Sequence, residues 1–175
     1  MALKDITDFH GQAARAWAYI EQHNIRVLWR DLEPPENGFY SWHPGARPCI
    51  VLANRLKADP LLMKCTLWEE LGHHVTATEE MRRQPFILYC TSGWRVGETV
   101  ENQALRWASL HLVTETEIRW WLDDGAGTIE EFARRFAITE EMAFARLNAL
   151  QAHNPSLWGR IMDFMADRGE RDTSA

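Results

Sequence analysis

The stretch KCTLWEELGHH, residues 64–74, lies near the middle of the chain and decides how the rest is interpreted. Apolar and small residues recur through and around it at helical spacing, at Leu61, Cys65, Trp68, Gly72 and Val75. This period predicts a helix that begins near Pro60 and carries one buried stripe. Residues four apart share a face of a helix, so Glu69 and His73 should point in the same direction.

Glu69 and His73 have the spacing of two metal ligands. The stretch matches the zinc-peptidase signature H-E-x-x-H except at its first position, where the chain has Glu69. Glu70 lies about 100° further round the helix, where its carboxylate can act as a general base towards a water molecule. A second register pairs Glu70 with His74, which makes His74 an alternative ligand. We rank it lower because the general base should directly follow the first ligand, and that residue would be Leu71.

Gly72 points to a packing requirement on the same helix. Glycine costs a helix about 1 kcal/mol relative to alanine, so its presence predicts the close approach of a second helix. The segment ETVENQALRWASLHLV has helical period, with a stripe of small residues that begins at Glu101. Glu101 is therefore the expected third ligand. One histidine and two carboxylates leave a divalent ion nearly neutral, and the harder oxygen ligands favour Mn²⁺ or Fe²⁺ as alternatives to Zn²⁺.

The segments on either side predict an α+β fold. Residues 5–23 have helical period, and three segments rich in β-branched and aromatic residues follow, which predicts a small antiparallel sheet of about three strands. Residues 77–97 break the pattern and predict an irregular connection with room for a short strand. Thr128 and Thr139 have the sequence signature of helix N-caps, so the C-terminal third should be mostly helical.

Composition limits the classes of function. The chain has 175 residues and a net charge of −6, which argues against direct binding of nucleic acid, because that needs a basic surface. Its three cysteines are widely spaced, which suggests neither a disulfide framework nor a zinc ribbon. The N-terminus lacks a hydrophobic signal region, and no apolar run is long enough to span a bilayer. We therefore expect a cytoplasmic protein with no membrane contact.

Two motifs together resemble the ImmA/IrrE family of zinc metallopeptidases. Residues 64–74 are similar to the family's T-L-x-H-E-L-G-H, and ENQALRWA at residues 101–108 is similar to its E-x-x-A-x-x-F-A. The resemblance covers roughly residues 20–115 and implies a minimal zincin-like (gluzincin) fold, with Glu70 as general base and His73 and Glu101 as ligands of one divalent metal, most simply Zn²⁺. Glu69 departs from the motif, and its role as a ligand is our inference.

The resemblance also implies a domain organisation and a substrate. We expect a zincin-like domain over residues 1–123, a helical extension over 124–165 and a disordered tail over 166–175. Members of this family cleave helix-turn-helix (Xre-type) repressors and so release silenced genes in phages, mobile elements or stress regulons. The mechanism also needs a donor for the oxyanion, and four residues are candidates by type, Tyr40, His43, His74 and Tyr89.

Two other functions compete with the peptidase. One is a zincin-like module that has lost its metal and only binds a protein partner, which the substitution at Glu69 favours. The other is a DNA-binding regulator, because TIEEFARRFAITEEMAFARLNAL, residues 128–150, resembles a helix-turn-helix. The second helix of that pair begins with Glu140 and Glu141, a poor charge for facing phosphates, so a supporting helical pair is the preferred interpretation.

Overall fold

The described residues form thirteen elements of secondary structure. The computed structural model describes the backbone of residues 9–90, 100–125 and 127–172, and the side chains of 11–88, 100–125 and 127–164. In chain order the elements are α1 (Phe9–Gln22), β1 (Arg26–Arg30), β2 (Gly38–Trp42), β3 (Cys49–Ala53), η1 (Asn54–Ala58), α2 (Pro60–Thr76), η2 (Met81–Arg83), β4 (Phe86–Cys90), α3 (Val100–Leu112), α4 (Glu115–Asp123), α5 (Ile129–Arg135), α6 (Glu140–His153) and α7 (Pro155–Asp172).

The four strands form one mixed sheet in the order β1-β3-β2-β4. β2 pairs antiparallel with β3 and β4, whereas β1 pairs parallel with β3. The α+β class is confirmed, but the sheet has one strand more than expected and is not wholly antiparallel. The reason is that β1 and β2 do not form a hairpin: β3 returns after a tight turn and lies between them. The short strand expected within residues 77–97 is β4.

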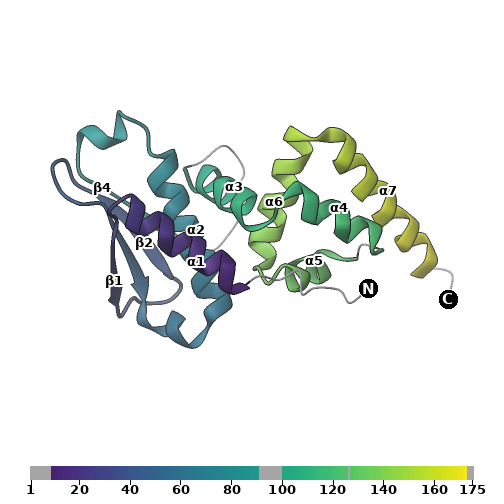
Figure 1. The fold of residues 1–175 in the computed structure, drawn as a ribbon, viewed down its shortest axis with the longest axis horizontal. Helices are drawn as coiled ribbons and strands as arrows, with labels where there is room; N and C mark the ends of the chain where they lie inside the picture. Colours follow the sequence, from purple (N-terminus) through teal and green to yellow (C-terminus); the bar gives the residue numbers. More distant parts are fainter. Residues whose placement is uncertain (1–8, 91–99, 126, 173–175) are drawn as a thin grey trace.

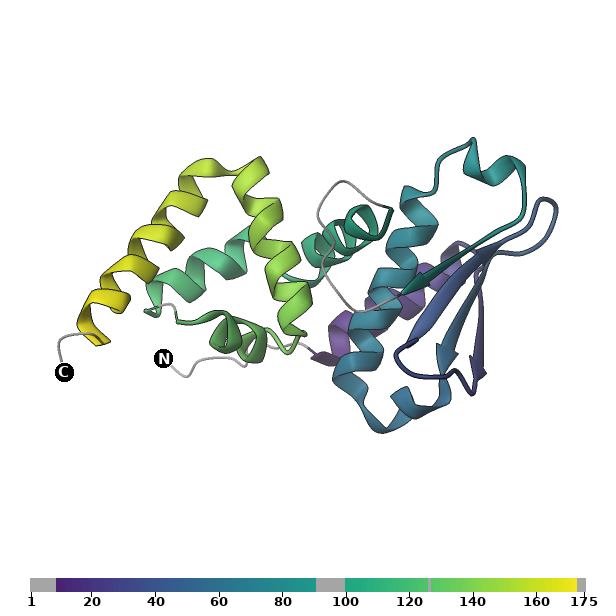
Figure 2. The same ribbon diagram turned by 180° about the vertical axis from the view of Figure 1, so that it is seen from behind.

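The sheet lies at one end of an elongated molecule and helices α4–α7 lie at the other, with α2 and α3 between them (Figure 1; Figure 2 shows the reverse side). Asp59 caps the start of α2 by accepting a hydrogen bond from the Leu62 backbone at 3.0 Å. Every residue from Lys64 to His74 is buried, so α2 is enclosed on all sides and does not bury only the single predicted stripe.

The C-terminal helices continue the same hydrophobic core. Capping boxes start α4 at Thr114 and α5 at Thr128, and the Thr139 side chain caps α6, as the sequence predicts for the last two. Residues on both sides of position 123, such as Leu122 and Phe132, belong to one core cluster. The boundary placed at residue 123 therefore stays a prediction, and no gap in the core marks it.

The chain ends differ in part from expectation. Helix α1 is described from Phe9, and residues 5–8 of the predicted first helix lie outside the described residues. The segment 166–175 was expected to be a disordered tail, but α7 continues to Asp172 and only 173–175 lie outside the description. Once a helix has formed, each further residue adds a backbone hydrogen bond, so a polar segment can extend it without an apolar pattern.

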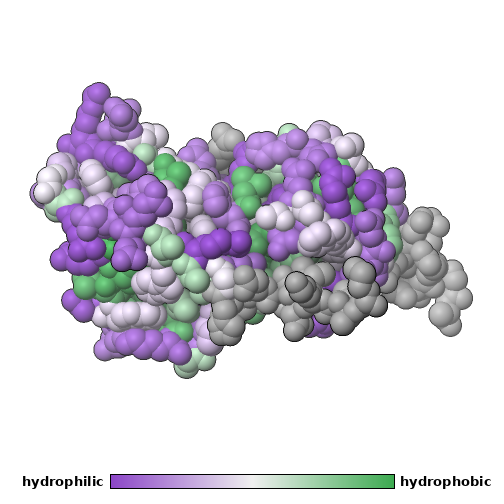
Figure 3. Space-filling view, in the orientation of Figure 1, coloured by the Kyte–Doolittle hydropathy of each residue, from purple (hydrophilic) through white to green (hydrophobic). Residues whose placement is uncertain are grey.

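One face of the molecule is mainly polar. In the space-filling view of Figure 3, hydrophilic residues cover much of the visible face, and hydrophobic atoms show in smaller areas between them. Within the described part of the chain, no helix is both long enough and apolar enough to cross a membrane.

Candidate functional site

Glu70 is buried between α2 and the sheet. Its side chain has no solvent exposure, and a Cβ placed on Gly38 of β2 would lie 3.0 Å from its Oε1 atom. Glycine at position 38 therefore lets the strand approach the carboxylate closely. Neither oxygen of Glu70 has a hydrogen-bond partner among the described residues. Burial, and then the nearby charge of Glu69, raise the pKa of Glu70 well above its usual range.

His73 is the second buried group without partners. Its ring is fully buried, and within the described parts of the chain neither Nδ1 nor Nε2 forms a hydrogen bond. Burial lowers the pKa of His73 to about 4, so the imidazole is neutral at physiological pH. A neutral imidazole is the form that binds a metal ion.

Glu70 and His73 together fit the neighbourhood of a bound cation. An unpartnered buried polar group destabilises a fold by about 1–3 kcal/mol, so native proteins rarely contain several on one helix turn. A divalent metal would give the imidazole a partner, and a water molecule beside the ion would give the carboxylate one. The side chains present therefore suit the group that the sequence motif implies.

The other two predicted ligands, Glu69 and Glu101, do not complete a metal site among the described residues. Glu69 is 6% exposed and lines a hollow of about 20 Å³ together with Cys65 and Leu105, while Glu101 lies half-buried in the first turn of α3. Over the described side chains, no three His, Cys, Asp or Glu residues gather closely enough to hold a metal ion. The structure thus does not assemble Glu69, His73 and Glu101 into one ligand set, and that assignment stays a prediction.

The close approach expected at Gly72 is confirmed. A Cβ on Gly72 would lie 2.4 Å from the backbone oxygen of Ala104 on α3, far inside van der Waals contact. Ala104 and Ala108, from the predicted small-residue stripe, are both completely buried. The two motifs of the chain, on α2 and α3, are therefore packed directly against each other.

His74, unlike His73, has a hydrogen-bond partner among the described residues. A hydrogen bond of 3.0 Å joins its Nδ1 atom to the hydroxyl of Tyr40 on β2, and both side chains are buried. Burial raises the pKa of Tyr40 to about 12. Burial, followed by the charges of Arg82 and His23, lowers the pKa of His74 to about 4. This pairing gives His74 a structural role on the sheet side of α2, and its role as an alternative ligand stays a prediction.

Sequence reasoning named Tyr40 and His74 separately and missed their contact. The available signal was strand alternation, which places Gly38, Tyr40 and Trp42 on the face of β2 that packs against α2. Of the other oxyanion candidates, His43 is exposed, and its Nδ1 lies 3.0 Å from the backbone oxygen of Pro44. The side chain of Tyr89 lies outside the described residues.

Comparison with known protein families identifies the chain. The profile of the peptidase family described as the IrrE N-terminal-like domain matches residues 20–148, well over half of the sequence. The chain therefore belongs to this family, and the resemblance inferred from its two motifs is confirmed. The family is a zinc-dependent peptidase type, which supports a metallopeptidase-like role. A comparison with curated proteins gave no match.

Proposed function

We propose that this member of the IrrE N-terminal-like family is a metal-dependent endopeptidase that cleaves a helix-turn-helix (Xre-type) repressor in the cytoplasm. The observation that carries the proposal is the pair Glu70 and His73, buried and without described partners at the positions of the family motif. Such a pair is unfavourable in a protein that only needs to fold. It is useful in one that binds an ion and moves a proton.

The chemistry divides between a metal and the side chains of the chain. His73 would hold the ion, with Glu69 and Glu101 as the proposed further ligands, and the ion would supply a Lewis acid that polarises the scissile carbonyl. Zn²⁺ is the first choice, with Mn²⁺ or Fe²⁺ as alternatives. The raised pKa of Glu70 suits a general base, which takes a proton from the attacking water and returns it to the leaving amine.

The choice of a repressor as substrate rests on the family resemblance. The C-terminal helices support a protein partner over direct contact with DNA. In α6, the second helix of the apparent helix-turn-helix, seven residues are buried, including Arg146, and the helix packs against α3, α5 and α7. A recognition helix must present its side chains to the major groove, whereas half of the fourteen residues of α6 are buried in the core.

A second candidate function is a zincin-like module that binds a protein without cutting it. The observation that favours it is the lack of an assembled three-ligand set among the described residues, combined with Glu69 at the first ligand position. The two candidates share the fold and the partner class. They differ in whether metal binds tightly and whether a peptide bond breaks.

The test combines metal analysis with cleavage. The full chain is purified without chelator, its metal content is measured, and it is then incubated with the repressor encoded beside it. We expect about one divalent ion per chain and a shortened repressor, with cleavage reduced at least about a thousandfold in Glu70→Gln. The matched control is Glu79→Gln, an exposed glutamate just beyond α2, which should cleave as the wild type does.

The possible results separate the two functions. Metal without cleavage, in the presence of a repressor that binds, would support the binding module. No metal in the wild type, together with equal amounts of intact repressor for wild type and Glu70→Gln, would refute the peptidase.

A further inference from the structure

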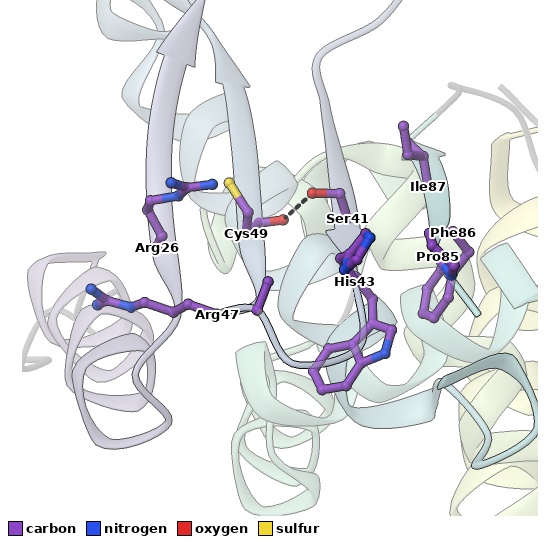
Figure 4. A pocket seen from close by; sticks show the side chains of 10 residues that line it. Arg26, Ser41, His43, Arg47, Cys49, Pro85, Phe86 and Ile87 are labelled. Atoms are coloured by element: carbon purple, nitrogen blue, oxygen red, sulfur yellow. Dashed lines mark hydrogen bonds between the residues drawn. The ribbon is translucent and has the colours of Figure 1, made fainter. Parts of the chain in front are cut away.

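A pocket of about 470 Å³ lies at the end of the sheet where β1, β3 and β4 begin and β2 ends (Figure 4). Four of its lining residues, Arg26, Cys49, Ser41 and Ile87, are paired in register across the four strands. Residues paired in this way project from the same face of a sheet. Because Tyr40 projects from the other face towards α2, these four side chains lie on the face of the sheet turned away from Glu70, while Trp42 and Phe86 reach the pocket from the Tyr40 face at the end of the sheet.

The polar groups of the pocket favour an anion. Arg26 is exposed, its guanidinium forms no hydrogen bond or ion pair with any described residue, and Figure 4 shows the side chain directed across β3 towards Cys49. Arg47 points away in the same view, and its Nε and Nη2 atoms donate to the backbone oxygens of Asn24 and Ile25 at 2.6 and 3.3 Å. No lining residue is acidic, although the chain contains 25 acidic against 19 basic residues. The local field is therefore positive in a protein of net negative charge.

The remaining lining residues add an apolar wall. Phe86 and Ile87 of β4, with Pro85 before them, form one side of the pocket, and Ile87 is 49% exposed. Arg26 on β1 and Ile87 on β4 belong to the two opposite edge strands of the described sheet, with Cys49 and Ser41 in line between them. An extended peptide that crosses this face can place alternate side chains along that line, because residues two apart on an extended chain project to the same side.

We propose that this pocket is a docking subsite for an extended acidic segment of a partner protein. A carboxylate of the segment binds the Arg26 guanidinium where it reaches across β3, and an aliphatic side chain two residues further along packs on Ile87, on the same face. A phosphate backbone fits less well, since of the two guanidinium groups that line the pocket only that of Arg26 is directed into it. Gly38, which contacts Glu70, lies three residues from Ser41 on β2, roughly 10 Å away, so a docked segment stays near the proposed site.

The test is a titration of the full chain followed by amide NMR. The probe is the peptide acetyl-Glu-Ser-Leu-Ser-Glu-Ser-Leu-amide, which in an extended conformation places its glutamates and leucines on one face. The control probe has glutamine in place of glutamate. The protein carries Glu70→Gln and no added metal, so that docking is measured separately from cleavage and does not depend on the proposed function.

We expect the acidic peptide to shift amides of residues 41–49 and 86–87 saturably and to bind at least about fivefold more tightly than the glutamine peptide. Arg26→Gln should weaken binding of the acidic peptide by a similar factor. Arg134→Gln is the matched control, because that side chain on α5 is 77% exposed and does not line the pocket, and it should bind as the parent does.

Equal binding of the two peptides, or an unchanged affinity in Arg26→Gln, would overturn the proposal. So would the absence of saturable shifts up to about 5 mM peptide, which corresponds to less than about 3 kcal/mol of binding energy. A single-stranded DNA oligonucleotide that shifts the same amides at lower concentration would assign the pocket to nucleic acid instead.

Discussion

The helix α2 contains two buried polar clusters, which differ in whether their side chains have described hydrogen-bond partners. Near its N-terminal end, Lys64 is completely buried, and its Nζ atom donates to Gln12 Oε1 and to the Ala137 backbone oxygen, both at 2.6 Å. Gln12 in turn donates to the Leu112 backbone oxygen at 2.7 Å. Two turns later, Glu70 and His73 are equally buried and have no described hydrogen-bond partners.

The difference shows that burial alone does not identify a functional group. Lys64 connects α2 to α1 and to the turn between α5 and α6, so its partners explain why a cation is tolerated in the core. Glu70 and His73 have no such partners among the residues that the structure describes. The first cluster should therefore control stability, and the second should control binding and chemistry.

The largest expected effect is the dependence of the free energy of unfolding on pH, which tests the burial of the histidines. Burial lowers the pKa of both His73 and His74 from 6.5 to about 4. The unfolded chain binds a proton at each ring below about pH 6.5, and the folded chain does so only near pH 4. The free energy of unfolding should therefore fall as pH falls through this window, by up to about 3 kcal/mol for His73 and by less for His74, which is less deeply buried. Urea unfolding in chelator at several pH values measures this dependence.

Glu70 acts in the opposite direction. Its raised pKa means that the folded state binds the proton more readily, so its contribution is present at low pH and is lost as pH rises above the usual value of 4.5. His73→Gln should reduce the loss of stability between pH 6.5 and 4, and an unchanged slope in this variant would contradict the assignment.

The next largest effect tests the cluster around Lys64, in which the polar atoms have hydrogen-bond partners. Lys64→Met keeps an unbranched apolar stem but leaves Gln12 Oε1 and the Ala137 oxygen without their donor. We expect the free energy of unfolding to fall by about 2 kcal/mol, measured by urea denaturation at pH 7. Metal content should not change. The control is Lys57→Met on η1, where the lysine is exposed and the loss should stay below about 1 kcal/mol. Equal losses in the two variants would mean that the buried contacts of Lys64 contribute nothing.

The smallest expected effect concerns Tyr40, whose hydroxyl is the hydrogen-bond partner of His74. Tyr40→Phe removes one hydroxyl and leaves Nδ1 of His74 without its partner at 3.0 Å. The expected destabilisation is about 1 kcal/mol, visible as a lower melting temperature. Metal content should stay the same, because His73 and not His74 is the proposed ligand. Loss of the metal in this variant would instead favour His74.

Local features of the fold were predictable from the sequence, because they depend on neighbouring residues. The caps at Thr128 and Thr139, the helix through residues 64–74 and the contact at Gly72 follow from spacing and residue type. The parallel pairing of β1 with β3 was not predictable, since it depends on which strand fills the centre of the sheet. Nor was the burial of Lys64, because lysine is usually exposed and its partners lie 52 and 73 residues away.

For the candidate site, the sequence identified residue types but not their surroundings. Glu70 and His73 were expected on one helix, and their shared lack of partners became visible only in three dimensions. The grouping of Glu69 with Glu101 depends on side-chain directions across two helices, which helical spacing does not determine. The pocket beside Arg26 has no motif, because its residues come from the ends of four strands.

The contact between Gly72 and Ala104 also restricts which sequences can adopt this fold. Any other residue at position 72 adds atoms where the Ala104 carbonyl already lies, and α3 cannot retreat without opening the buried stripe behind it. Position 72 should therefore remain glycine in proteins that keep this helix pair, even where residues 69 or 74 vary. In related chains, glycine at this position should therefore vary less than the proposed metal ligands around it.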